Sequence, residues 1–363
     1  MNDSFGSKPN NSNKELMWAV LFVFIAALSV YAVVTASRSF SWNQLKAMIE
    51  GAHPLFVCLA VLCMLCFILF EGLSLRVLIK SFSHKCKLKD CIIFSAADIY
   101  FSAITPSATG GQPACAYFMA KSGIPTSCVT VSLVFNLALY TFSIIIIGAV
   151  CFLIFPGIYF FFRPLTRVLI VLGAVTLVLL ALLFILFILK KSFIDNAGWF
   201  IIGVGSKLHI IKNREVWNSK LAKWTEEYMQ YADQIWLHKK DIAIALLFNV
   251  IQRACQMAVT MFMYIAVYIG RPGFSARGVI ANGVHLFGAQ SLITIGATYI
   301  PVPGAMGFTD LMMLDGFSSL MPESEAAALE LISRSISFYG CVILCFIIVV
   351  AAFLARRDSN EEE

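Results

Sequence analysis

The chain has 363 residues, of which 60% are hydrophobic and only 13% are charged, and its mean hydropathy is +0.83. A soluble domain could not keep this much apolar surface away from water, so the composition excludes that class and predicts an all-α polytopic membrane protein. The net charge of +6 lies in a few loops, which indicates membrane orientation and argues against a nucleic-acid partner.

The apolar segments follow one another with short breaks. Residues 1–15 are polar, and we expect them to be disordered. The run 16–36 is long enough to cross a bilayer and too long for a signal-peptide core, so it predicts a retained first helix. Further runs of at least the roughly 20 residues that a crossing needs lie at 54–79, 126–154, 164–190, 241–269 and 325–354. We therefore expect residues 16–354 to form one transmembrane domain.

Clusters of basic residues predict the orientation. Lysines crowd the loop after 54–79, and nine basic residues lie between 190 and 240. The positive-inside rule places both segments in the cytoplasm, together with the tail 355–363. Lys8 and Lys14 place the N-terminus there as well.

Two apolar regions, 91–121 and 277–320, are interrupted by glycine and proline. The orientation of the flanking spans requires the first to begin and end inside. Its leading arm, 91–104, is about 21 Å of helix against a hydrocarbon core of about 30 Å, so it predicts a re-entrant hairpin. The second region begins and ends outside, and its longer arms leave open either a re-entrant hairpin or two full crossings. The pattern predicts two inverted-topology repeats, 54–154 and 241–354, each with a broken hairpin.

The first break, TPSATGGQP, covers residues 105–113. Pro106 interrupts helix geometry, and Gly110 and Gly111 permit positive φ and close approach of the backbone. Thr105 and Gln112 add neutral hydrogen-bonding groups. A helix that begins here would point its N-terminus at a cavity, which favours an anion such as phosphate.

The second break, PVPGAMG, covers residues 301–307 and has similar chemistry. Pro303, Gly304 and Gly307 interrupt the backbone, and Asp310 lies in the first turn of the next helix. Both breaks could also be simple turns between helices. Irregular backbone at membrane depth persists only where protein or a wet cavity satisfies it, which favours a functional interpretation.

Charged residues inside the apolar spans indicate a site. Arg253 and Arg334 lie about 12 and ten residues into their spans, a depth at which a charge needs water or a partner. Four acidic residues could pair with them, and such pairs could simply lock helices together: Glu71, Asp98, Asp310 and Asp315. Glu71, Asp98 and Asp310 are also candidates for proton coupling.

The segment at about 205–238 predicts an amphipathic helix. One face carries an aromatic and aliphatic row at spacings of three and four residues: Trp217, Leu221, Trp224, Tyr228, Tyr231 and Ile235. This face could lie on the cytoplasmic leaflet or pack against the underside of the bundle.

Motifs of catalysis are missing from the sequence. It contains no GxxxxGK[ST], HExxH or GxSxG pattern, and its cysteines lack the paired spacing of a zinc site. We expect no catalytic residue, no metal and no cofactor, with the eleven cysteines as buried thiols. His285 is the one histidine within an apolar arm, where a packed side chain is the simplest interpretation.

The stretch TPSATGGQPACAYFMAKSGIP resembles the signature of the flippase-like membrane domain found in lysylphosphatidylglycerol synthases. FEGLSLRVLI, PVPGAMGFTDLMML and the neighbourhood of Arg334 resemble other blocks of that domain in the same order. The sequence departs from the pattern at Ala305, where a glycine is usual, and at Asp310, where glutamate is usual. The resemblance implies the lipid-translocating half standing alone, without the aminoacyl-transfer domain.

These features together predict a lipid flippase or scramblase of the bacterial cytoplasmic membrane. A phosphate-bearing headgroup would bind between the two hairpin tips, with Arg253 and Arg334 offsetting its charge. Its partners would be membrane lipids and a lipid-modifying enzyme encoded separately. Two other classes stay open: a small-molecule or ion transporter of the same architecture, and a glycosyltransferase or accessory protein of lipid glycosylation that uses Asp98 and Glu71.

Overall fold

The computed structural model describes residues 42–105, 108–207, 214–298, 300, 302, 305 and 307–361. The predicted first span, 16–36, and the polar segment before it lie outside these residues, as do Pro106, Pro303 and Gly304.

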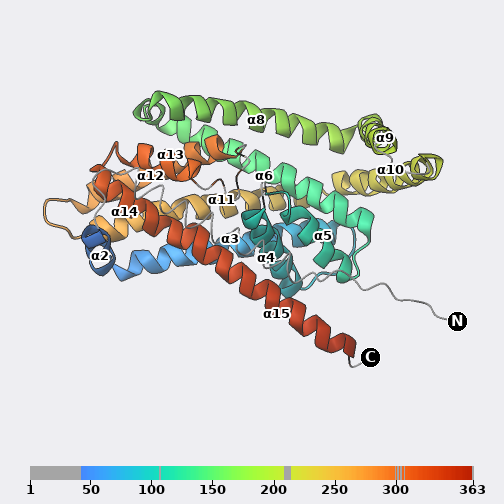
Figure 1. The fold of residues 1–363 in the computed structure, drawn as a ribbon, viewed down its shortest axis with the longest axis horizontal. Helices are drawn as coiled ribbons and strands as arrows, with labels where there is room; N and C mark the ends of the chain where they lie inside the picture. Colours follow the sequence, from blue (N-terminus) through green and yellow to red (C-terminus); the bar gives the residue numbers. More distant parts are fainter. Residues whose placement is uncertain are drawn as a thin grey trace.

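Every regular element in the described part of the chain is a helix (Figure 1). In order they are α2 (Trp42–Glu50), α3 (Pro54–Ser81), α4 (Leu88–Ile104), α5 (Gly111–Lys121), α6 (Thr126–Ile154), α7 (Ile158–Phe161), α8 (Pro164–Leu189), α9 (Lys191–Lys207), α10 (Arg214–Leu237), α11 (Lys239–Tyr268), α12 (Ala276–Ala297), α13 (Phe308–Phe317), α14 (Glu323–Arg334), the π-helix η3 (Ser335–Gly340) and α15 (Cys341–Glu361). Six helical segments in this part are long and apolar enough to cross a membrane: α3, α6, α8, α11, α12 and the continuous run 323–355. The chain is therefore an all-α, multi-pass membrane protein.

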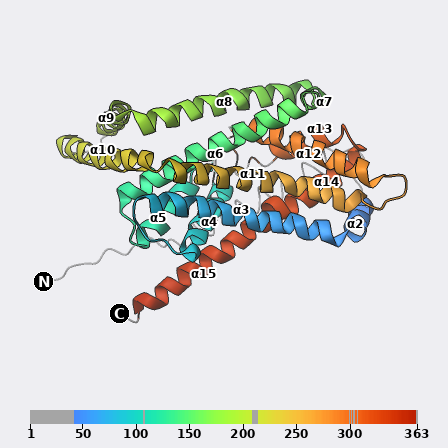
Figure 2. The same ribbon diagram turned by 180° about the vertical axis from the view of Figure 1, so that it is seen from behind.

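The two interrupted regions form helical pairs of different proportions. In the first, α4 has 17 residues and α5 has 11, about 26 and 17 Å of helix, and both are shorter than a bilayer core. In the second, α12 has 22 residues, enough for a full crossing, whereas α13 has only ten. Figures 1 and 2 place these pairs towards opposite ends of the bundle, which is the arrangement that inverted repeats would produce.

The long helices α3 and α11 form an antiparallel pair at the centre of the bundle. At one end the N–H of His53 donates to the carbonyl oxygen of Ala266 at 2.7 Å. At the other end the hydroxyl of Ser81 donates to the carboxylate of Asp241 at 3.1 Å. Between them a buried amide of Asn249 joins the pair to α6 through other polar side chains. This pair provides the rigid frame against which both helical hairpins pack.

Helix α8 crosses α12 at very short range because both helices carry glycine at the contact. A Cβ on Gly173 would lie 2.1 Å from the carbonyl oxygen of Ile295, and one on Gly296 would lie 3.3 Å from the Cα of Ile170. Small residues allow such close approach of helix backbones in membranes. The opposite face of α8 exposes apolar side chains, with Leu165 at 73%, which suits contact with lipid.

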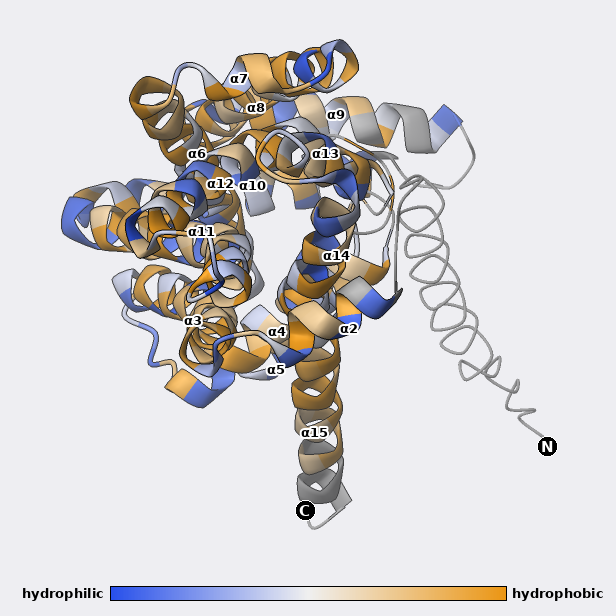
Figure 3. Cartoon of the chain, turned by 90° about the vertical axis from the view of Figure 1, so that its left-hand side faces the viewer, coloured by the Kyte–Doolittle hydropathy of each residue, from blue (hydrophilic) through white to orange (hydrophobic). Residues whose placement is uncertain are grey.

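Figure 3 shows the hydropathy of the same helices in an end-on view. Hydrophobic residues dominate α15, and α14 carries hydrophilic residues as well as hydrophobic ones. The first turn of α14 carries Glu323 and Glu325. Large apolar side chains such as Leu153 and Leu179 are exposed on the long helices, so the bundle has the apolar exterior that a bilayer requires.

Helix α10 corresponds to the expected amphipathic helix and packs against the bundle. Tyr228 and Ile235 from its apolar row are 1% and 0% exposed, and burial raises the pKa of Tyr228 to about 12. The hydroxyl of Ser127, in the first turn of α6, donates to Glu227 at 2.8 Å. Trp217, from the same row, stays 48% exposed near the start of the helix. A second helix, α9, precedes α10 and was not predicted.

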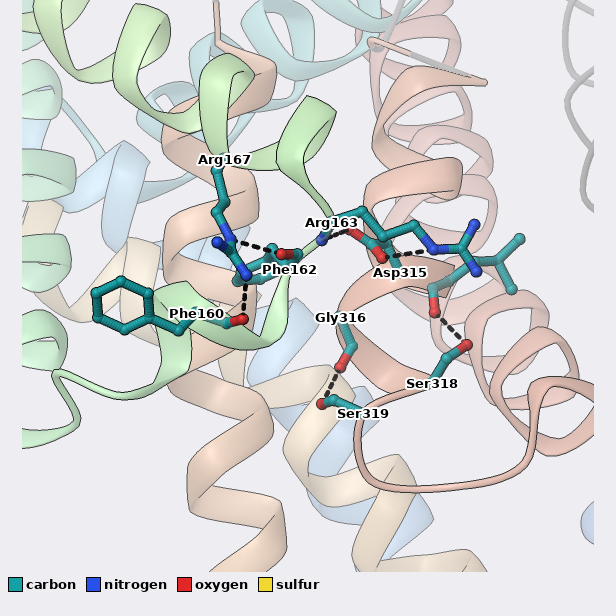
Figure 4. A network of polar contacts seen from close by, with 9 residues as sticks. Phe160, Phe162, Arg163, Arg167, Asp315, Gly316, Ser318 and Ser319 are labelled. Atoms are coloured by element: carbon teal, nitrogen blue, oxygen red, sulfur yellow. Dashed lines mark hydrogen bonds and ion pairs between the residues drawn. The ribbon is translucent and has the colours of Figure 1, made fainter.

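Asp315 joins α13 to the start of α8 instead of pairing with Arg253 or Arg334, so that part of the prediction is wrong. Its carboxylate accepts the main-chain N–H of Arg163 at 2.8 Å and lies 3.3 Å from the Nε of that arginine (Figure 4). Arg167 donates to the carbonyl oxygens of Phe160 and Phe162 beside this contact. Because residues 163 and 315 are far apart in sequence, spacing alone gave no sign of the pairing.

Candidate functional site

A cavity of about 520 Å³ lies where the two hairpins and the central helices meet. Its lining includes six of the residues singled out in the sequence or adjacent to them in the same motifs: Glu71, Asp98, Gln112, Arg253, Ala305 and Arg334. Apolar side chains of α8, among them Leu180 and Phe184, cover part of the wall. The cavity is therefore mixed in character, with charged groups on an otherwise apolar surface.

The first hairpin turns on a residue with left-handed backbone. Ala108 has φ 55°, and its N–H donates to the carbonyl oxygen of Thr105 at 3.2 Å. The hydroxyl of Thr105 accepts the N–H of Gly110 at 2.8 Å and so occupies a donor at the start of α5. Gly110 itself has φ −82°, so the expected positive φ falls on Ala108 and not on this glycine.

The second hairpin repeats this turn. Ala305 has φ 49°, and its N–H donates to the carbonyl oxygen of Val302 at 2.8 Å. Aligning Thr105 with Val302 matches both alanines and places Gly307 opposite Gly110. Both alanines line the cavity. The same local geometry thus occurs twice, although the glycine usual in the resembled family is replaced at the second position.

Gly111 is required by close approach between the arms of the first hairpin. A Cβ at this position would lie 2.2 Å from a carboxylate oxygen of Asp98 and 2.7 Å from its carbonyl oxygen. Gly307 serves a different purpose: it has φ 82° and nothing within 4 Å of an added Cβ. The two hairpins therefore use glycine for different physical reasons.

Arg253 lies midway along α11 and is 8% exposed. Its guanidinium stacks over the rings of Tyr140, 4.0 Å from the centroid, and Phe67, 4.9 Å away, and it donates to Gln256 at 2.7 Å. Among the described residues no carboxylate oxygen lies within 4.0 Å of it, and its Nε has no hydrogen-bond partner. A buried cation in a cavity without an ion-pair partner has spare capacity for an anion.

Arg334 is equally buried, at 7% exposure, but forms an ion pair. Its Nε lies 2.8 Å from a carboxylate oxygen of Asp310, and its guanidinium stacks on Phe338 at 4.6 Å. The other carboxylate oxygen of Asp310 accepts the N–H of Gly307 at 2.8 Å. Asp310 thereby ties the second hairpin to the last long helix. The Nη2 of Arg334 has no hydrogen-bond partner.

Two carboxyl groups face Arg253 from α3 and α4. Glu71 and Asp98 lie against each other, close enough to share a hydrogen bond. Both carboxyl groups interact electrostatically with the guanidinium of Arg253, although neither forms an ion pair with it. The amide of Gln252 donates to Glu71 at 3.0 Å, and that of Gln112 donates to Asp98 at 3.0 Å. Helices α3, α4, α5 and α11 thus meet at one charged centre.

Several residues of the site were missed from the sequence. Gln252, Gln256 and Tyr140 escape notice because isolated polar or aromatic residues are common in apolar spans. Gln252 and Gln256 do flank Arg253 in NVIQRACQ, and that cluster of amides is the signal that could have found them. The π-helix η3, which begins directly after Arg334 and gives Ser337 and Phe338 to the cavity wall, has no clear signature in sequence.

A network of buried polar side chains joins the helices that carry the site. The hydroxyl of Ser74 donates to Asn136 at 2.7 Å, and the Nδ2 of Asn249 donates to that hydroxyl at 2.8 Å. These three residues join α3, α6 and α11, and all three are buried. Such a network fixes the helices that carry Glu71 and Arg253.

No catalytic or metal-binding group stands out in the part of the chain that the structure describes. Groups of three or more His, Cys, Asp or Glu side chains that could hold a metal do not occur there. His285 packs between the rings of Phe155 and Phe161. The cysteines covered by the structure carry free thiols.

A family profile described as the lysylphosphatidylglycerol synthase TM region matches residues 17–345. This interval contains both hairpins, both arginines and every lining residue of the cavity. No curated protein matches the chain.

Proposed function

Because the chain belongs to the family of the lysylphosphatidylglycerol synthase TM region, we propose that it is a lipid translocase, a flippase or scramblase. A polar headgroup carrying phosphate enters the cavity of about 520 Å³, and the acyl chains stay in the bilayer. The apolar outer faces of the long helices keep the cavity within reach of lipid. The protein performs no covalent chemistry in this proposal.

The single observation that carries the proposal is the unpaired guanidinium of Arg253 in the cavity wall. Two aromatic rings hold its plane in place, so little conformational entropy is lost when it binds a phosphate oxygen. Hydrogen bonds to charged groups contribute about 1.5–3 kcal/mol each. Gln112 and Thr309 offer neutral contacts on other parts of the wall.

The wider setting is proposed on the same basis. The two hairpins, with 54–154 and 241–354 around them, act as inverted repeats that expose the cavity alternately to each side. The membrane is the bacterial cytoplasmic membrane, with both termini inside. A separately encoded lipid-modifying enzyme supplies the lipid.

Reconstitution of the full chain into vesicles of phosphatidylglycerol and phosphatidylethanolamine tests the proposal. Fluorescently labelled phosphatidylglycerol in the inner leaflet becomes accessible to membrane-impermeant dithionite only if it is moved across. We expect fast loss of protected fluorescence with the wild-type chain and slow loss with Arg253→Gln. Arg163→Gln is the matched control, because Arg163 is 74% exposed and pairs with Asp315 outside the cavity.

Uptake of inorganic phosphate or glycerol phosphate by the same vesicles separates lipid movement from small-anion transport. If wild-type vesicles accumulate these solutes and do not move labelled lipid, the chain is a small-anion transporter. If Arg253→Gln moves lipid as fast as the wild type, the assignment of the cavity is wrong.

A further inference from the structure

Behind Arg334 lies a second pair of carboxyl groups that the proposed lipid path does not use. Glu330 precedes Arg334 by one helical turn on α14 and is 1% exposed. Its carboxyl lies against that of Asp310 on α13, close enough to share a hydrogen bond. Its Oε2 has no hydrogen-bond partner, and the neighbouring hydroxyl of Ser333, fully buried, has none either.

The charges of this cluster do not balance. Asp310, Glu330 and Arg334 carry one positive and two negative charges when all are ionised, so the group has a net charge of −1. An uncompensated charge at this burial is strongly unfavourable, and two carboxylates in contact repel each other. One proton held between the two carboxyls removes both problems. The other charged group that faces Glu330 is Arg334, on its own helix.

The centre around Asp98 of the first hairpin has the same composition. Glu71 and Asp98 touch each other, and Arg253 supplies the positive charge from α11. The other titratable groups near this centre are the thiols of Cys115 on α5 and Cys345 on α15. The two centres differ in one respect, because Arg334 forms an ion pair with its carboxylate and Arg253 does not.

We infer that Asp310 and Glu330 form a proton-binding site whose occupancy follows the position of Arg334. With Arg334 paired to Asp310, one proton on Glu330 makes the cluster neutral. When a phosphate in the cavity draws the guanidinium away, Asp310 loses its countercharge and takes up a second proton. Departure of the phosphate returns Arg334 to Asp310, and that proton leaves. Arg334 can act in this way because it lines the cavity while Asp310 and Glu330 lie behind it.

This inference rests on the proposed function only where it links the proton to lipid, so two independent measurements test it. The first is infrared spectroscopy of the purified full chain in nanodiscs at neutral pH. We expect the carbonyl stretch of protonated carboxyl groups, with part of the band lost in Glu330→Gln. Glu323→Gln, an exposed residue in the first turn of the same helix, leaves the band unchanged. An unaltered band in Glu330→Gln overturns the proton site.

The second measurement imposes a pH gradient on vesicles that contain labelled phosphatidylglycerol. Movement of one proton with each lipid shifts the equilibrium ratio between leaflets about tenfold per pH unit. We expect this shift with the wild type and with Glu323→Gln. The double variant Asp310→Asn, Glu330→Gln, which has no carboxyl left in the cluster to exchange a proton, still moves lipid but distributes it equally.

The outcomes separate the two proposals. A wild-type distribution that ignores the pH gradient overturns the coupling, and one that follows a sodium gradient instead shows that the site takes a metal cation. If no lipid moves at all but the infrared band is lost in Glu330→Gln, the proposed function fails and the proton site stands. If Glu330→Gln does not fold, Asp310→Asn gives the same infrared comparison.

Discussion

Arg253 and Arg334 face the same cavity at similar burial, yet their surroundings differ. Arg334 lies 2.8 Å from a carboxylate oxygen of Asp310, whereas Arg253 rests between two aromatic rings with no carboxylate within 4.0 Å in the described structure. An ion pair of the first kind holds two helices together. A stacked, unpaired guanidinium of the second kind is held ready for an incoming anion. The comparison therefore assigns stability and proton coupling to Arg334 and the larger share of headgroup binding to Arg253.

The largest expected effect follows from breaking the ion pair. Arg334→Gln leaves Asp310 and Glu330 buried without a positive charge, and removal of one partner of a buried pair costs about 3–5 kcal/mol. Thermal unfolding in detergent should show a large decrease in Tm. The double variant Arg334→Gln, Asp310→Asn should recover part of this loss, and a Tm as low as that of the single variant would contradict the ion-pair account.

A smaller effect, on transport and not on folding, is expected at Arg253. Loss of a charged hydrogen bond of about 1.5–3 kcal/mol corresponds to a decrease in lipid translocation of about 10–100-fold. Arg253→Gln should change the Tm much less than Arg334→Gln does. Arg253→Lys keeps the charge but loses the planar stacking, so its translocation rate should lie between those of the wild type and Arg253→Gln. An equal decrease in Tm in Arg253→Gln and Arg334→Gln would contradict the different roles assigned to the two arginines.

The two hairpin glycines extend the comparison. Gly111→Ala forces a methyl group against the backbone of Asp98, and overpacking of this kind costs about 1–3 kcal/mol. Gly307→Ala meets no atom but places alanine at φ 82°, a strain of about 1–2 kcal/mol. Measured by thermal unfolding, both should destabilise. Only Gly111→Ala should also slow translocation, because it displaces Asp98 at the cavity wall.

The smallest effect is expected where alanine already adopts left-handed backbone. Ala305→Gly relieves the strain at φ 49°, and Ala108→Gly does the same at φ 55°. Each should leave stability within about 1 kcal/mol of the wild type or raise it. A loss clearly larger than this in the Tm would show that the methyl groups make contacts that outweigh the strain.

Much of the site could be predicted because charges are conspicuous in apolar sequence. Arg253, Arg334, Asp98 and Glu71 stood out for that reason, and the cavity brings all four together. Glu330 was overlooked although it is also charged and lies in AAALELISR, one turn before Arg334, where it could pass for an ordinary helical neighbour of that arginine.

Features that depend on three-dimensional contacts could not be predicted. The pairing of Asp315 with Arg163 joins distant segments, and the π-helix after Arg334 depends on tertiary packing. In the described part of the chain, the long apolar runs 54–79, 126–154, 164–190, 241–269 and 325–354 gave spans that are correct within a few residues, because hydrophobic length is a strong signal in membranes. Hydrophobic length did not settle the relative lengths of α12 and α13, because both lengths depend on where the break at 301–307 falls.

The most direct test of the central claim is an electron cryo-microscopy structure of the full chain in nanodiscs that contain phosphatidylglycerol. The account predicts headgroup density in the cavity, with a phosphate oxygen about 3 Å from the guanidinium of Arg253. A cavity without headgroup density, with Arg253 paired instead to Glu71 or Asp98, would contradict it.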